Sequence, residues 1–264
     1  MRFDRYLVEN KYYSTREKAI VAIKEGKVFL NNKVVKKPSF DVNLDINLSI
    51  TIVHDGNEYV SRGGKKLEHA IKYFNLDFNN KVILDIGSST GGFTDCALKF
   101  GAKKVCAIDV GTKQMVDELA NNDKVVLIEN FNLKDLKIET FNENFDFIAT
   151  DVSFISLKHV FPVVNLISNE NTMFISLIKP QFETDNQFIN NNGVIKDKIV
   201  HINVIKKVVN YARENNFYLN NITFSPIKGK KEGNIEFLAL FSHTKIDKEF
   251  NIEEIVDKAH ANLI

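Results

Sequence analysis

The chain has 264 residues, of which 44% are hydrophobic, and its formal net charge at pH 7 is +1. This length fits one large domain, or a small domain joined to a medium one, with ample apolar content for a core. No apolar run approaches the roughly 18 residues needed to span a bilayer, and the first ten residues contain no signal-peptide core. We therefore expect a cytoplasmic protein without a membrane segment.

Cysteine and histidine give no sign of a metal site. Cys96 and Cys106 are an isolated pair without metal-ligand spacing, and the six histidines are scattered without an HExxH pattern. We expect both cysteines to be reduced core residues and assign no metal.

The near-neutral net charge conceals a basic N-terminal segment. Residues 1–37 contain ten Lys or Arg against four acidic residues, a net charge of +6. A solvated surface is the simple interpretation, but a one-sided field suited to phosphates is the alternative, because acids are sparse where the bases cluster.

Local patterns predict a compact helix and hairpin in this segment. Ser14 and Glu17 have capping-box spacing and Gly26 stands at a C-cap position, which predicts a helix over 15–25. Two short strands should follow, joined by Asn31 and Asn32, which tolerate the left-handed conformation of a tight turn.

The N-terminal segment 2–39 resembles the small RNA-binding domain first described in ribosomal small-subunit protein four. From 38 to 59 there are four acids and no Lys or Arg, so we place the boundary near 60 and predict domains 1–60 and 61–264. The stretch 61–65 is expected to be a loop, followed by a helix. The resemblance, with cations at the start of the second domain, predicts RNA contacts from Arg5, Arg16, Lys18, Lys24, Lys27, Arg62 and Lys65.

The stretch KVILDIGSSTGGF, residues 81–93, has the pattern of a nucleotide-type pocket. Its apolar run indicates a strand buried in a parallel sheet, and its glycines allow a tight turn against a ligand. Asp109 ends the next strand, twenty-two residues after Gly87, where a carboxylate can accept ribose hydroxyls. A simple turn is the alternative, but GSSTGG fits S-adenosylmethionine better than the GxGxxG of dinucleotide-binding folds.

Strands and helices alternate beyond this loop, which predicts a doubly wound α/β sheet closed by an antiparallel pair. The expected strands cover 82–85, 104–109, 125–129, 145–151, 173–179, 218–224 and 235–241, and helices should begin at Gly92, Thr112, Leu157 and Ile199. Parallel strands end at one edge of a sheet, so Gly87, Asp109, Glu129, Asp151 and Lys179 should converge there.

Charged residues at these strand ends suggest acid–base chemistry. Lys179 follows an apolar strand and needs a carboxylate partner, which Asp151 can supply, and Glu236 is a further acid in an apolar stretch. Structural ion pairs are the alternative. For methylation of a ribose 2′-hydroxyl, Lys179 is the candidate base, because burial and neighbouring Lys66 disfavour the charged amine.

Six motifs in register resemble the TlyA-type (haemolysin A) ribosomal RNA 2′-O-methyltransferases, whose catalytic domain is similar to the FtsJ methyltransferases. They are SRGGKKLEHA, DIGSSTGGFTDCALKFGA, AIDVG, DVSFISL, LIKPQFE and SPIKGKKEGNIEF. The resemblance implies a catalytic tetrad of Lys66, Asp151, Lys179 and Glu236, with S-adenosylmethionine as methyl donor and a cytidine of 16S or 23S ribosomal RNA as substrate. We expect donor contacts from Asp85, Gly87, Ser89, Thr90, Gly91, Gly92, Phe93, Asp109, Val110, Glu129, Asn130 and Asp151.

Three other functions remain as alternatives. A pore-forming haemolysin would need an amphipathic spanning segment or a secretion signal, and the sequence shows neither. A pseudouridine synthase can carry the same N-terminal module but would lack the methyl-donor loop. A non-catalytic RNA-binding ribosome factor would require a degenerate donor pocket, whereas the glycine loop and the tetrad are intact.

Overall fold

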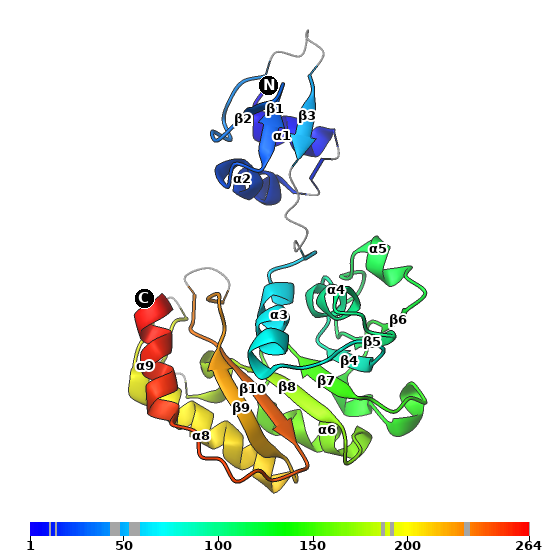
Figure 1. Cartoon of the computed structure of the whole chain (residues 1–264), viewed down its shortest axis with the longest axis vertical. Helices are drawn as coiled ribbons and strands as arrows, with labels where there is room; N and C mark the ends of the chain where they lie inside the picture. The colour runs from blue at the N-terminus through cyan, green and yellow to red at the C-terminus, as the bar shows by residue number, and fades with distance from the viewer. Residues whose placement is uncertain are drawn as a thin grey trace. The chain divides into compact units, whose positions relative to one another are not determined.

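The computed structural model describes residues 1–10, 12–13, 15–42, 48–52, 59–185, 188–190, 193–229 and 233–263. The chain divides into two compact units, Met1–Glu58 and Tyr59–Ile264 (Figure 1).

The first unit packs two helices against a small antiparallel sheet. Its elements are α1 (Phe3–Glu9), α2 (Arg16–Lys24), β1 (Val28–Leu30), β2 (Lys33–Val34) and β3 (Ile50–Ile52), with strand order β2-β1-β3. Figure 1 shows both helices beside this sheet. The core between them is apolar and contains Phe3, Leu7, Ala19, Ala22, Ile23, Val28 and Val42.

The predicted helix and hairpin of this unit are confirmed, with one correction. The N-cap of α2 is Thr15, whose hydroxyl accepts a hydrogen bond from the Lys18 amide at 3.3 Å. Ser14, the predicted cap, lies outside the described residues. Asn31 and Asn32 have φ values of 48° and 64°, the left-handed conformation that a two-residue hairpin turn requires.

The second unit is a sheet covered by helices on both faces. Its strands are β4 (Val82–Ile86), β5 (Lys104–Ile108), β6 (Val125–Ile128), β7 (Phe147–Thr150), β8 (Met173–Ile178), β9 (Tyr218–Phe224) and β10 (Phe237–Ser242). Among the described residues the strand order is β6-β5-β4-β7-β8-β10-β9, and β10 runs antiparallel to both of its neighbours. The predicted doubly wound α/β fold with a closing antiparallel pair is confirmed.

The sheet separates two large apolar cores, and helices cover each of them. The helices are α3 (Gly63–Phe74), α4 (Gly92–Lys99), α5 (Asp117–Ala120), α6 (Phe161–Ile167), α7 (Pro180–Glu183), α8 (Lys198–Glu214) and α9 (Ile252–Leu263), with short 3-10 turns η1 (Leu133–Asp135), η2 (Ile138–Thr140) and η3 (Leu157–His159). One core includes residues of α3 and α4, and the other includes residues of α6, α8 and α9. Figure 1 shows α3 and α8 on opposite sides of the sheet.

Three predicted elements of this unit are wrong in detail. The stretch 61–65 is not all loop, because α3 begins at Gly63. No helix begins at Thr112: Lys113 has a φ of 53°, and the only helix before β6 within this described stretch is the single turn α5. At Leu157 the chain forms the 3-10 turn η3, and α6 begins only at Phe161.

Among the described residues, no helix has the combination of length and apolarity that crossing a membrane requires.

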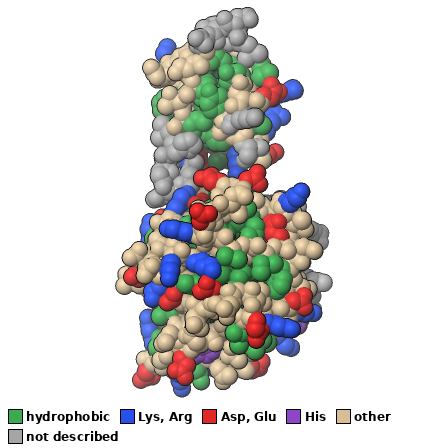
Figure 2. All heavy atoms as spheres, turned by 90° about the vertical axis from the view of Figure 1, so that its right-hand side faces the viewer, with side chains coloured by type: hydrophobic (Ala, Val, Ile, Leu, Met, Phe, Trp, Pro, Cys, Tyr) green, Lys and Arg blue, Asp and Glu red, His purple; other side chains and the backbone are tan. Residues whose placement is uncertain are grey.

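Cys96 and Cys106 are buried and form no disulfide, as predicted for core cysteines. Figure 2 shows Lys and Arg side chains interspersed with Asp and Glu on one face of the molecule, with hydrophobic side chains among them.

Candidate active site

The carboxyl ends of the parallel strands meet at one edge, as the alternating pattern predicts. Ile86 pairs with Ile108 and with Thr150, and Thr150 pairs in turn with Ser176. The residues that follow these strands therefore project from the same edge of the sheet, although they are far apart in sequence.

The loop between β4 and α4 has the conformation that its glycines allow. Gly87 and Gly91 have φ values of 82° and 93°, a region that glycine enters without strain. A Cβ on Gly87 would lie 3.4 Å from the Asp151 carbonyl oxygen and 3.1 Å from a Val152 methyl carbon. The glycine loop and the end of β7 are thus in close contact, which brings the predicted donor pocket beside Asp151.

A second glycine contact joins α3 to this loop. A Cβ on Gly92 would overlap the Ser61 hydroxyl oxygen and would lie 3.0 Å from the Gly64 nitrogen. Glycines at the starts of α3 and α4 let the two helices approach closely. Gly63 and Gly64, which were predicted to lie in a loop, are therefore at the start of α3.

Buried polar atoms around the glycine loop lack partners within the described chain. Asp85 Oδ2 accepts a hydrogen bond from the Thr94 hydroxyl at 2.7 Å, but Asp85 Oδ1 and Ser88 Oγ are buried without one. Burial raises the pKa of Asp85 to about 7, although the bond from Thr94 acts in the opposite direction. Unpaired buried polar atoms of this kind fit a polar, cationic ligand such as the amino-acid end of S-adenosylmethionine.

The other predicted donor residues follow β5 and β6. The Asp109 carboxylate accepts hydrogen bonds from the amides of Ser89, at 2.8 Å, and Gly111, at 2.7 Å. Each carboxylate oxygen has a second acceptor position, so Asp109 keeps the capacity to accept ribose hydroxyls. Val110 beside it is 70% exposed, an apolar surface suited to a purine face.

Glu129, a predicted donor contact, holds the loop after β5. Its carboxylate accepts hydrogen bonds from the backbone amides of Lys113, Gln114 and Met115, which lower the pKa of Glu129 below its usual range. This loop is the segment where a helix was predicted. The backbone amide of Asn130, the other predicted contact after β6, donates to the Gly111 carbonyl at 2.8 Å.

The remaining predicted donor residues belong to the glycine loop itself. Gly92 and Phe93 are buried at the start of α4, and Phe93 packs in the core that α3 and α4 share. Thr90 is exposed, and its carbonyl accepts a hydrogen bond from the Val116 amide at 3.4 Å.

The four residues of the predicted tetrad form one connected cluster of ion pairs. Lys179 Nζ lies 2.6 Å from Asp151 Oδ1, and Lys66 Nζ lies 2.7 Å from Glu236 Oε2 and 3.5 Å from Asp151 Oδ2. Burial of Asp151 opposes its ionisation, but Lys179 and Lys66 outweigh that effect and hold the pKa of Asp151 below its usual range. Two cations and two anions thus balance in a largely buried site.

Four elements bring the tetrad together. Asp151 and Lys179 directly follow β7 and β8, and Lys66 points inward from α3. Glu236 directly precedes β10, and because β10 is antiparallel to β8, with Phe237 opposite Ile178, its first residue lies at the edge where β8 ends. Glu236 was predicted to lie within this strand, whereas it directly precedes it. Its position beside Lys66 is unaffected by this difference.

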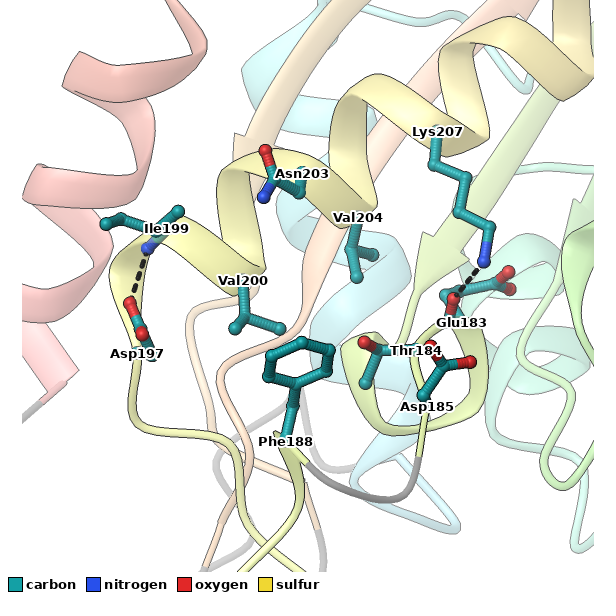
Figure 3. Close-up of a pocket in the computed structure, with 10 residues that line it drawn as sticks. All are labelled: Glu183, Thr184, Asp185, Phe188, Asp197, Ile199, Val200, Asn203, Val204 and Lys207. Carbon is teal, nitrogen blue, oxygen red and sulfur yellow. Dashed lines mark hydrogen bonds between the residues drawn. The ribbon is translucent and has the colours of Figure 1, made fainter.

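A buried glutamate that sequence reasoning did not single out holds the loops that carry Asp151 and Lys179. Glu183, in α7, accepts hydrogen bonds from the Ser156 hydroxyl at 2.6 Å and the Leu157 amide at 2.7 Å. Burial raises the pKa of Glu183. Figure 3 shows Lys207 of α8 reaching the carbonyl of Glu183, at 2.9 Å, beside a cavity of about 180 Å³ that is separate from the glycine loop.

An exposed aromatic ring stands beside the tetrad. Phe154 is 91% exposed and has a φ of 64°, a conformation that is strained for a bulky residue. Its ring lies 5.0 Å from the ring of Phe182, and Ser153 before it accepts a hydrogen bond from Lys179 at 2.9 Å. An exposed ring held in this way offers a stacking surface for a nucleobase.

The predicted RNA contacts of the first unit are not equally available. Arg16 is half exposed and is held by buried Asp4 at 3.0 Å, and Arg5 pairs with Glu9 but is 69% exposed. Lys27 is largely covered and pairs with Glu25 at 2.7 Å. On α2, Lys18 and Lys24 are exposed in addition to Arg16.

Comparison with known families matches both units. Residues 59–242 match the FtsJ-like methyltransferase family, and residues 1–45 match the S4 domain. The chain belongs to the FtsJ-like methyltransferases. Within this FtsJ-like domain, the glycine loop and the ion-pair cluster described above share one edge of the sheet.

Relatives match this sequence over nearly the whole chain. The sequence is 42% identical to Hemolysin A of Brachyspira hyodysenteriae, covering 91% of this chain and 99% of that one. It is 32% identical to the 16S/23S rRNA (cytidine-2′-O)-methyltransferase TlyA of Mycobacterium tuberculosis, covering 98% and 96%. A solved Streptococcus thermophilus structure with a hemolysin name superposes with a TM-score of 0.77 at 35% identity, covering 99% and 96%.

Proposed function

We propose that this FtsJ-like methyltransferase transfers a methyl group from S-adenosylmethionine to the 2′-hydroxyl of a cytidine in 16S or 23S ribosomal RNA. The observation that carries the proposal is the cluster of Lys66, Asp151, Lys179 and Glu236 directly beside the glycine loop. The TlyA relative, whose name states this reaction, supports the choice of substrate.

The roles of the tetrad follow from its geometry. S-adenosylmethionine supplies a methyl group activated by a sulfonium charge. In the ion pair Lys179 is an ammonium, so it must first release its own proton to solvent. The neutral Lys179 Nζ then takes the proton of the 2′-hydroxyl as the methyl group passes from sulfur to that oxygen, and the Asp151 carboxylate, 2.6 Å away, stabilises the ammonium that forms again. Lys66 joins Asp151 to Glu236 and so orients the carboxylate that faces Lys179.

Replacing the proposed base tests the assignment. Lys179→Ala should lower the rate of methyl transfer by about 10²–10⁴-fold, the usual contribution of a general base, with S-adenosylmethionine affinity nearly unchanged. The measurements are transfer of labelled methyl groups to ribosomal subunits and calorimetric titration of the donor. Lys103→Ala, at an exposed lysine before β5 on the opposite edge of the sheet, is the control. Full turnover by Lys179→Ala would refute the role.

A further inference from the structure

The outward face of α3 lines a groove that the methyl-transfer site does not use. Its lining residues are Lys65, Glu68, His69 and Lys72 of α3, with Pro226 and Ile227 of the segment after β9, and its volume is about 280 Å³. The four helix residues are spaced i, i+3, i+4 and i+7, which places them on one face. The opposite face of α3 packs in the core.

Both walls of this groove connect to the tetrad. Lys65 directly precedes Lys66 on α3. On the other wall, the Ser225 amide donates to the Glu236 carbonyl at 2.8 Å, and the Ser225 hydroxyl donates to the Ile227 carbonyl at 2.6 Å. The groove therefore begins beside the Lys66–Glu236 ion pair and extends outward from it.

The groove has a basic rim. Arg62 is exposed and donates to the Lys228 carbonyl at 2.6 Å, which fixes its guanidinium at the start of α3. Lys72 pairs with Glu68 at 2.6 Å, and exposed Lys65 makes no ion pair within the described residues. Among the described residues here, Lys65 and Lys72 of the groove and Arg62 at the start of α3 outnumber the single carboxylate of Glu68, and this excess of positive charge favours a polyanion.

His69 adds an unsatisfied polar atom to the groove. Its Nε2 is buried without a hydrogen-bond partner in the described chain, and its ring stacks against Tyr73 with centroids 5.7 Å apart. Burial lowers the pKa of His69, so the ring is neutral near pH 7 and can donate or accept one hydrogen bond. Because Nε2 is inaccessible, a hydroxyl or base group of a ligand would bond to Nδ1, which makes no hydrogen bond within the described residues.

We propose that this α3 groove binds the single-stranded RNA segment adjoining the target nucleotide, with Lys65 and Lys72 on its phosphates and His69 on a sugar or base. The proposal rests on the proposed function, because it assigns a path to the substrate of the same site. A protein of the ribosomal subunit is the other possible occupant, and charge and the free imidazole favour RNA.

The first test neutralises the two lysines in the full chain. Lys65→Gln with Lys72→Gln should weaken binding to poly(C) RNA and reduce the slope of log K against log salt by about 1.4, since each single-strand phosphate contact contributes about 0.7. The matched control is Lys103→Gln with Lys124→Gln, two exposed lysines before β5 and β6 at the opposite edge. An unchanged slope, or an equal loss in the control, would overturn the proposal.

The second test isolates His69. His69→Phe keeps a ring beside Tyr73 but removes the nitrogens, so it should weaken poly(C) binding about 2–10-fold, the effect of one hydrogen bond, without changing the salt slope. Unchanged affinity would remove His69 from the proposal.

Two comparisons separate the possible failures. If the lysine variant binds poly(C) normally but binds whole ribosomal subunits weakly, the groove contacts protein and the RNA assignment is wrong. Binding is measured without S-adenosylmethionine, so the result stands even if the wild type transfers no methyl group, the outcome that would refute the proposed function.

Discussion

At the scale of single residues, we predict that Asp85 makes donor binding depend on pH. Its buried carboxyl has a pKa raised to about 7 by burial and an oxygen without a partner, so it is protonated below neutrality and ionised above. S-adenosylmethionine is cationic, and only the ionised carboxylate attracts it. Donor affinity should therefore rise between about pH 6 and pH 8, which calorimetric titration measures.

Two variants complete this test. Asp85→Asn cannot ionise, so its donor affinity should be lower above neutrality and nearly independent of pH. Asp123→Asn, at an exposed aspartate far from the glycine loop in sequence, should follow the wild type. A wild-type affinity that does not change with pH would show that Asp85 does not face the donor.

Site residues could be predicted from the sequence where a charged residue directly follows an apolar strand. Asp151 and Lys179 each follow an apolar strand, so a parallel sheet alone brings them together. Glu183 and Phe154 lacked such a signal. Glu183 matters because it accepts two hydrogen bonds from another loop, and Phe154 matters because its ring is exposed. Neither property is visible in the local sequence.

At the scale of elements, α7 and the loop after β7 act as one unit because of Glu183. Glu183→Ala leaves the buried Leu157 amide without its acceptor, which should reduce the free energy of unfolding by about 1–3 kcal/mol and slow methyl transfer. Glu183→Gln keeps an acceptor oxygen and should lose less of both. Urea unfolding and single-turnover methyl transfer measure the two effects. Equal behaviour of both variants and the wild type would mean that Glu183 does not hold the loops.

The same scale shows which elements the sequence predicts well. The limits of strands β4 and β9 agree with prediction to within a residue. No helix begins at Thr112, because Lys113 has a left-handed φ of 53° and the loop of 113–115 is held by the Glu129 carboxylate from the next strand end. That contact is tertiary, and no local pattern reports it.

At the scale of the whole molecule, the near-neutral net charge is unevenly distributed between the two domains. The S4 domain has the basic segment, with Arg16 fixed by buried Asp4, and the FtsJ-like domain has a charge-balanced site with a basic groove beside it. We assign RNA binding to both domains and methyl transfer to one edge of the sheet in the FtsJ-like domain.

The most direct test of the central claim is the chemical identity of the product. Purified protein, S-adenosylmethionine with a labelled methyl group and unmodified 16S and 23S ribosomal RNA in their subunits are incubated, and the RNA is digested to nucleosides for mass spectrometry. We expect label in 2′-O-methylcytidine, formed about 10²–10⁴-fold more slowly with Lys179→Ala. Label on a base atom, or no label in either subunit, would contradict it.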